Sequence, residues 1–204
     1  IKWLKDGIRA ARKLGDRLAE GRHYGNLGNA YSDKGQLQRA REFYKRHLDI
    51  ALSAGDKHGA SNALGNLGNV EYGSGRAREA ISFYQRSLDM SRGGADQSGE
   101  AATMLNLGAA YSQLNDKTAA EAYYQQALQI YQQVGDWRSV SHCLGNLGLL
   151  KMSDGSMEEV LSLYEERLRI ARELKDSRSE ARAELGLAQL HAKQPVTTAG
   201  LPVL

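Results

Sequence analysis

The chain repeats itself every 40 residues, and this period constrains its fold more than any other feature of the sequence. Aspartate, asparagine, leucine and tyrosine each return at a fixed place in the period. The four columns are Asp16, Asp56, Asp96, Asp136 and Asp176; Asn26, Asn66, Asn106 and Asn146; Leu27, Leu67, Leu107, Leu147 and Leu187; and Tyr44, Tyr84, Tyr124 and Tyr164. A period of about 20 to 50 residues is typical of stacked units that form an elongated solenoid with a long open surface. The repeat therefore favours a binding protein over an enzyme.

The distribution of proline predicts that the repeats are helical. Both prolines, Pro195 and Pro202, lie in the last ten residues, so no proline interrupts the chain before them. Proline removes a backbone donor and breaks helices, whereas the Ala, Leu, Gln, Glu and Arg that dominate the rest of the chain favour them. We therefore expect an all-α structure.

Each repeat contains two stretches with helical periodicity. In the first full repeat Tyr24, Leu27 and Tyr31 share one face of a helix, and Tyr44 and Leu48 share one face of the next. A break that contains glycine or asparagine separates the two stretches in every repeat. Either residue can end a helix there, because both tolerate a left-handed backbone. Each repeat is therefore predicted to form a pair of antiparallel helices, A and B.

The joints between repeats carry their own signals. Gly55 stands directly before Asp56, a glycine that can end one helix before an aspartate that can cap the next. The same dipeptide occurs at two other joints, whereas Ala95 and Lys175 replace the glycine at the remaining two. We expect the aspartate caps to form at all five joints.

These signals divide the chain into one array and a tail. The array is expected over residues 1–194, and the tail over residues 195–204. Within the array the predicted boundaries are a B helix at 1–15, full repeats at 16–55, 56–95, 96–135 and 136–175, and a final A helix at 176–194. We expect ten helices, and the tail either docks on apolar surface or is disordered.

A glycine column runs through the predicted A helices. It comprises Gly28, Gly68, Gly108 and Gly148. Glycine in the middle of a helix costs about 1 kcal/mol relative to alanine, so its recurrence requires a packing reason. We expect close approach of a neighbouring helix at these positions.

The pattern resembles the tetratricopeptide repeat (TPR). The family motif places a large residue, Leu-Gly and Tyr along helix A, then Ala and an aromatic along helix B. In the first full repeat these places hold Tyr24, Leu27, Gly28, Tyr31, Ala40 and Tyr44. The resemblance extends over residues 1–194, although the usual period is about 34 residues, the motif's proline is absent, and Glu71 and Lys151 replace the aromatic at the Tyr31 position. It implies a right-handed α-solenoid superhelix whose concave groove is lined by A helices and receives an extended or helical protein segment.

The longer period is similar to that of three groups within this family. These are the Leu-Gly-Asn spindle-orientation adaptors, the kinesin light chains and the TPR sensor regions of bacterial signalling proteins. The chain opens on Ile1 rather than Met, so we interpret it as part of a longer adaptor or signalling protein. The partner of the array could then be another domain of the same parent chain.

Composition excludes several classes of partner. The 27 basic and 24 acidic residues give a formal charge of +3, too balanced for a protein that binds nucleic acid phosphates. No stretch approaches the roughly 18–20 apolar residues of a membrane helix. The single cysteine, Cys143, favours a reducing compartment, and we expect the cytoplasm. The histidines show no metal-ligand spacing, so we expect neither a metal nor a cofactor.

The asparagines of the A helices are the leading candidates for partner binding. They comprise Asn26, Asn66, Asn106 and Asn146, with Asn29 and Asn69 three residues further along two of the helices. They lie beside the packed Leu-Gly positions, where side chains point into the groove. An amide both donates and accepts, so these residues could bond to a peptide backbone whatever its side chains. The alternative is that the amides tie adjacent A helices together.

Four further residues are expected to flank these amides in the groove. They are Arg22, Asn62, His142 and Arg182, each four residues before the asparagine column or its equivalent. If they face the groove, its two ends are basic and favour an acidic partner segment. The alternative is a solvated basic surface without a binding role.

Catalysis has little support in the sequence. His142 and Cys143 are consecutive, and consecutive residues of a helix do not face each other. Cys143 falls in a column of small side chains, which predicts a packed, inert thiol. We therefore expect a non-catalytic module that binds a protein or peptide. The alternative function is an architectural element that self-associates through its terminal helices.

Overall fold

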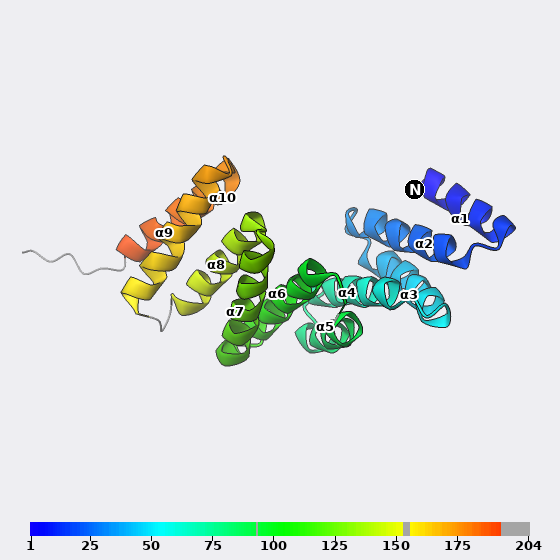
Figure 1. Cartoon of the computed structure of the whole chain (residues 1–204), viewed down its shortest axis with the longest axis horizontal. Helices are drawn as coiled ribbons and strands as arrows, with labels where there is room; N and C mark the ends of the chain where they lie inside the picture. The colour runs from blue at the N-terminus through cyan, green and yellow to red at the C-terminus, as the bar shows by residue number, and fades with distance from the viewer. Residues whose placement is uncertain (93, 153–155, 193–204) are drawn as a thin grey trace, which may run out of the picture. The chain divides into compact units, whose positions relative to one another are not determined.

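The computed structural model describes residues 1–92, 94–152 and 156–192, and these residues form ten α-helices (Figure 1). In chain order they are α1 (Lys2–Leu14), α2 (Arg17–Ser32), α3 (Leu37–Ser53), α4 (Lys57–Gly73), α5 (Ala77–Ser91), α6 (Gln97–Gln113), α7 (Lys117–Val134), α8 (Trp137–Lys151), α9 (Met157–Glu173) and α10 (Ser177–Ala192). The predicted all-α class and the division of each repeat into two helices are confirmed. The tail predicted at 195–204 lies outside the described residues.

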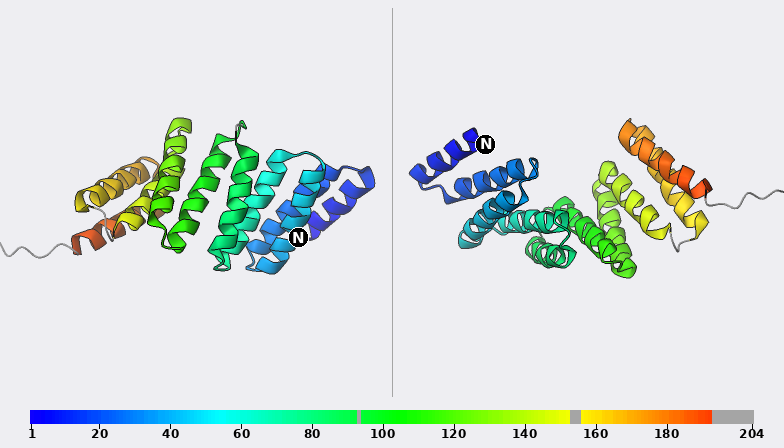
Figure 2. Two further views of the ribbon diagram at one scale, coloured as in Figure 1. Left: turned by 90° about the horizontal axis from the view of Figure 1, so that it is seen from below. Right: turned by 180° about the vertical axis from the view of Figure 1, so that it is seen from behind.

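The helices group into two compact units, Ile1–Ile130 and Tyr131–Leu204. In the first unit, consecutive helices from α1 to α6 pack as antiparallel neighbours, and α2 and α6 each also contact α4 (Figure 2). In the second unit α8, α9 and α10 all contact one another. Helix α7 crosses the boundary between the units.

Aspartate caps begin the A helices, as predicted. The Asp56 carboxylate accepts a bond of 2.8 Å from the Gly59 amide, and Asp16, Asp96, Asp136 and Asp176 make the equivalent bonds. Each bond satisfies an amide that has no partner within its own helix. The repeated aspartate therefore fixes where each A helix starts.

Most B helices end in a left-handed residue. Gly55 adopts a φ of 69°, and Lys175 adopts a φ of 54° at the equivalent place despite its side chain. Ala95 does not follow this pattern. Helix α5 already ends at Ser91, two residues before the equivalent end of α3, and its C-cap Arg92 is extended with a ψ of 128°. The predicted repeat boundaries did not include this early end.

The core repeats one contact between a tyrosine and a glycine. A methyl group on Gly28 would lie 2.5 Å from a ring carbon of Tyr44, and one on Gly148 would lie 2.9 Å from Tyr164. The two other repeats have the same arrangement, and all four tyrosines are buried. The glycine column therefore lets each B-helix tyrosine lie against the A-helix backbone. This confirms the packing reason that the sequence suggested.

The two departures from the aromatic column form ion pairs instead. Glu71 is buried, and its carboxylate pairs with two arginines. Its Oε1 lies 2.8 Å from the Arg41 Nη2, and its Oε2 lies 2.5 Å from the Arg76 Nε. Lys151 lies 2.9 Å from Glu159 on the B helix of its own repeat. Charged pairs thus replace apolar packing where the TPR-like pattern lacks its tyrosine.

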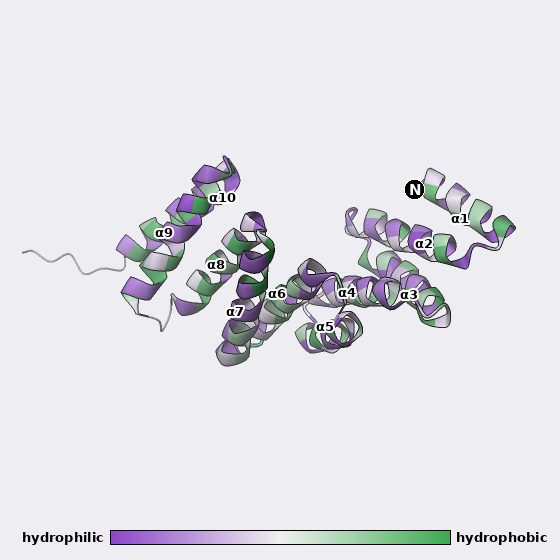
Figure 3. Cartoon of the chain, viewed as in Figure 1, coloured by the Kyte–Doolittle hydropathy of each residue, from purple (hydrophilic) through white to green (hydrophobic). Residues whose placement is uncertain are grey.

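In Figure 3 every helix combines hydrophilic and hydrophobic residues. Among the described residues no helix is long and apolar enough to cross a membrane.

Candidate functional site

The column asparagines lie at the surface of their A helices. Asn26 on α2 is exposed, and Asn66, Asn106 and Asn146 are half-buried. The leucine that follows each of them is buried in the core, so one residue separates the packed side of each helix from its open side. None of the four amides is turned into the core. Asn146 belongs to the second unit, whereas the other three belong to the first.

Some amides have a structural role. Asn29 accepts a bond of 2.8 Å from the Tyr44 hydroxyl, and Asn69 accepts one of 2.7 Å from Tyr84. Asn106 also donates to Asn69 across 3.3 Å, which links α6 to α4. The alternative that the amides tie adjacent A helices together therefore applies to the bond between Asn106 and Asn69, whereas Asn29 and Asn69 bond to the B-helix tyrosine of their own repeat. Asn29 and Asn69 hold the core tyrosines in place from the surface.

The other column amides have no such contacts. Asn26, Asn66 and Asn146 form no side-chain hydrogen bond to any part of the chain that the structure describes. Their amides are free to meet a ligand. Asn66 lines a pocket.

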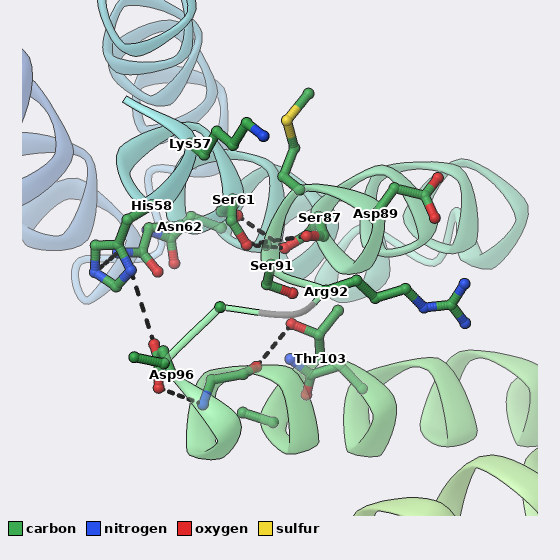
Figure 4. A pocket seen from close by; sticks show the side chains of 18 of the residues that line it. Lys57, His58, Ser61, Asn62, Ser87, Asp89, Ser91, Arg92, Asp96 and Thr103 are labelled. Carbon is green, nitrogen blue, oxygen red and sulfur yellow. Dashed lines mark hydrogen bonds and ion pairs between the residues drawn. The ribbon is translucent and has the colours of Figure 1, made fainter. Parts of the chain in front are cut away.

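The pocket lies between α4 and α6, with the end of α5 along one side (Figure 4). It has a volume of about 610 Å³, and its lining combines polar side chains with a larger apolar surface. Its lining includes Ser61, Asn62, Asn66 and Asn69 of α4, Ser87, Met90 and Ser91 of α5, and Ala102, Thr103 and Asn106 of α6. Four of the predicted partner-binding asparagines thus meet around one cavity.

Two small residues, Gly65 on α4 and Ser87 on α5, form the floor of this pocket. A methyl group on Gly65 would still lie 3.6 Å from the Ser87 hydroxyl, so the space above them is open. Ser61 and Ser87 are both buried and form two hydrogen bonds with each other. The Ser87 hydroxyl donates to the Ser61 carbonyl at 2.8 Å, and the Ser61 hydroxyl donates to the Ser87 carbonyl at 3.0 Å. These bonds leave the floor polar yet satisfied.

The same two positions are occupied differently in the other repeats. In the first repeat His47 lies over Gly25, where a methyl group would be 2.8 Å from the histidine Nδ1. In the fourth, Arg167 lies over Gly145. In the third, the equivalent residues are Leu105 and Ala127, so the larger side chain comes from the A helix. Only the Gly65–Ser87 combination is small on both sides, and this explains the pocket in the second repeat.

The joint between α5 and α6 borders the pocket (Figure 4). Because α5 ends early, Arg92, Gly94 and Ala95 line the cavity instead of a further helical turn. On the opposite side, His58 lies 3.9 Å from Asp96, and its Nε2 is 3.0 Å from the Asn62 amide. The predicted residue Asn62 is therefore exposed and tied to a neighbouring helical turn rather than free.

The predicted basic residues are divided between the units. Arg22 is exposed in the first unit, whereas His142 and Arg182 are exposed in the second. Burial, followed by the charges of Arg167 and Arg182, lowers the pKa of His142 below its ordinary value. His142 therefore stands in a cationic environment, as the sequence suggested, and the buried contributor Arg167 was not among the predicted residues.

Cys143 is a packed thiol, as predicted. It is fully buried on α8, and burial raises its pKa to about 12. A thiol with this pKa is protonated at neutral pH and is a poor nucleophile. Within the described part of the chain, no group of three or more His, Cys, Asp or Glu side chains is placed to hold a metal ion.

Sequence reasoning missed the B-helix residues of this face. Ser87 and Arg167 occupy one column of the repeat, and Gly65 and Gly145 occupy the column that faces it. The sequence did contain a signal for the cavity. If the residue sizes in the Gly65 column and the Ser87 column are compared repeat by repeat, only the second repeat has a small residue in both. The asparagine column alone did not indicate the cavity.

A comparison with protein families decides what kind of chain this is. The profile of the tetratricopeptide repeat matches residues 20–93 and again 59–133, which together cover more than half of the chain. The chain belongs to the tetratricopeptide repeat family. TPR domains are generally modules that bind proteins or peptides. A search of curated protein sequences found no match.

Solved TPR structures share the fold at low sequence identity. The TPR-like repeats of a putative kinesin light chain from Podosopora anserina match with a TM-score of 0.70 and 18% identity, over 84% of each chain. A STAND signal transduction ATPase with a TPR sensor, from Pyrococcus horikoshii, matches with a TM-score of 0.74 and 18% identity, over 94% of this chain and 33% of that one. YrrB, described as a TPR protein with an unusual peptide-binding site, matches with a TM-score of 0.60 and 19% identity, over 92% and 85% of the two chains.

Proposed function

We propose that this TPR array binds a segment of another protein on the asparagine-bearing face of α4 and α6. The observation that carries the proposal is the pocket in the second repeat, where the unbonded Asn66 amide lies beside an open cavity. Ligand sites combine a concave surface with a few convergent polar groups, and this pocket has both. The partner could be a separate protein or another domain of the parent chain.

The chemistry of the site suits a peptide. The Asn66 amide can donate to a backbone carbonyl and accept from a backbone amide, which holds an extended chain without regard to its sequence. The cavity over Gly65 and Ser87 can then take one side chain of the segment. The surrounding amides can bond to a polar group of that side chain, and the apolar part of the lining can contact its carbon atoms. Sequence preference would come from this cavity and affinity from the amides.

We propose a binding role without catalysis. The one thiol is buried and protonated. The histidine at the pocket, His58, is bonded to Asn62 and lies near Asp96, with no nucleophile among its bonded neighbours. Catalysis would require a convergent acid, base or nucleophile. Self-association through the terminal helices stays a prediction, and the exposed Trp3 and Leu14 on α1 are the residues that favour it.

A plug variant tests the proposal directly. Peptides would first be selected from a displayed random library on the wild-type chain, and their affinities measured by calorimetry. The double substitution G65L/S87A copies the Leu105–Ala127 combination of the third repeat, so it should fill the cavity without disturbing the helices. We expect it to weaken the selected peptides at least about tenfold, a change of about 1.4 kcal/mol.

Two asparagine variants provide the matched comparison. N66A should reduce peptide affinity and leave the melting temperature unchanged, because Asn66 has no bond to lose. N69A should lower the melting temperature, because it removes the acceptor of the Tyr84 hydroxyl. Full peptide affinity in both G65L/S87A and N66A would contradict the proposal.

A further inference from the structure

The second unit contains a buried arginine without a partner. Arg167 on α9 is 7% exposed, and its Nε is buried without a hydrogen bond. No carboxylate or carbonyl among the described residues is bonded to its guanidinium. This differs from the other buried charges, Glu20 and Glu71, each of which lies against two arginines.

An unpaired charge in this environment is unfavourable. Buried charges in proteins are generally paired and hydrogen-bonded, because desolvation without compensation costs several kcal/mol. The guanidinium of Arg167 lies against the backbone of α8, where a methyl group on Gly145 would be only 2.5 Å from its Nη1. The burial also lowers the pKa of Arg167. A group from outside the described chain would compensate this charge.

The neighbours of Arg167 add further positive charge. Arg182 of α10 and His142 and Arg138 of α8 are close enough for their charges to influence one another, and α8, α9 and α10 pack together. Asp176 is the acidic residue near this group, but its carboxylate already accepts bonds from the Ser179 amide and hydroxyl at the start of α10. The cluster therefore has more basic than acidic side chains, and Asp176, the acidic residue near it, is already hydrogen-bonded.

The repeat shows where this cluster lies. Arg167 occupies the column of Ser87, and Gly145 occupies the column of Gly65. In the first unit this pair forms the floor of the pocket on the A-helix face. In the second unit the same place holds a guanidinium, and the flanking A-helix residues His142 and Arg182 are exposed. The position that is an open cavity in the second repeat is thus a cationic centre in the fourth.

We propose that Arg167, with Arg182 and His142 beside it, binds an oxyanion presented by the protein's partner. A planar guanidinium with its neighbours can give two parallel hydrogen bonds to a carboxylate or a phosphate, the strong arrangement for such groups. The source is either an acidic side chain or a phosphorylated residue, which share this chemistry. As a partner contact the site rests on the proposed function, but its affinity for small anions can be measured without any partner.

The test is a titration of the whole chain with small anions at constant ionic strength. The probes are acetate for a carboxylate, inorganic phosphate for a phosphorylated residue, and acetamide as the uncharged control. The Nε–H resonance of Arg167, assigned from its loss in a variant, reports on the group by NMR. We expect saturable shifts with acetate, phosphate or both, and none with acetamide. Acetate alone identifies a carboxylate site, and phosphate alone a phosphorylated ligand.

Two variants separate recognition from general salt effects. R167S copies the Gly65–Ser87 combination and G145L/R167A copies Leu105–Ala127, so each removes the charge with a pairing that the chain already uses. Because hydrogen bonds to charged groups are stronger than those between neutral groups, we expect at least about tenfold weaker anion binding in both variants, followed through the backbone amides of α8 and α10.

The result that would overturn the inference is an absence of saturable binding in the wild-type chain, or equal binding in the wild type and both variants. This outcome is distinguishable from a failure of the proposed function. Peptide binding depends on Asn66 and the pocket in the first unit, whereas the anion titration reads Arg167 in the second.

Discussion

At the scale of single residues, pairs of columns carry more information than single columns. The Tyr84 ring occupies the space that a side chain at Gly68 would need, whereas Gly65 faces an open cavity. Both are mid-helix glycines and look alike in the sequence. The structure separates them into a packing residue and a pocket residue.

This difference predicts opposite outcomes for two alanine substitutions. G68A would place a methyl group against the buried Tyr84 ring and should destabilise the fold by about 1–3 kcal/mol. G65A should be neutral or stabilising by up to about 1 kcal/mol, because there is room for the methyl group and alanine favours the helix. Urea unfolding of the two variants measures this. Equal destabilisation would contradict the distinction.

His142 predicts that anion binding depends on pH. Its lowered pKa means that it is neutral at neutral pH and takes up a proton below its ordinary range of about 6.5. Protonation adds a cation beside Arg167, Arg182 and Arg138, and Asp176 is the acidic group that opposes them. A bound anion favours this proton uptake, so affinity should rise as the pH falls.

The measurement is the acetate affinity between pH 8 and about pH 5.5, a range that extends below the ordinary histidine pKa and in which acetate stays largely ionised. We expect an increase of roughly tenfold for the wild type, equivalent to one added charged contact. H142Q should bind acetate with little change over this range, because glutamine does not titrate. An unchanged slope in H142Q would exclude His142 as the titrating group.

At the scale of helices, the joints were predictable and the lengths only in part. The aspartate column predicted each cap, and Asn115 adopts the left-handed φ of 62° that its place in a break suggested. The 40-residue period alone did not predict the early end of α5. The local signal is the pair of consecutive glycines at positions 93 and 94 of the sequence, because glycine disfavours a helix. The absence of glycine at Ala95 does not explain the early end by itself, because Lys175 also replaces that glycine and α9 still extends to Glu173.

The caps predict a measurable loss of stability when one is removed. D56A deletes the acceptor of the Gly59 amide and should cost about 1 kcal/mol. D49A is a suitable control, since Asp49 is exposed on α3 and forms no cap. Thermal unfolding of both variants compares them. A D56A variant as stable as D49A would show that the bond seen here contributes nothing.

At the scale of the whole chain, the 40-residue period was sufficient for the fold class and for the family. It predicts a candidate binding face, but not the different roles of the residues on that face. The period places Asn26, Asn66, Asn106 and Asn146 in one column, yet Asn106 helps to join two helices and Asn66 lines a pocket. These different roles arise from B-helix neighbours that vary between repeats, and a column of identical residues cannot show them.

The central claim is that a partner docks on the face of α4 and α6, and side-chain NMR of the asparagines tests it most directly. A selected peptide would be titrated into isotopically labelled protein while the side-chain amide signals are followed. The account predicts the largest shifts at Asn66, with smaller ones at Asn62 and Asn106. Shifts confined to the exposed faces of α3 and α5, with the Asn66 amide unchanged, would contradict it.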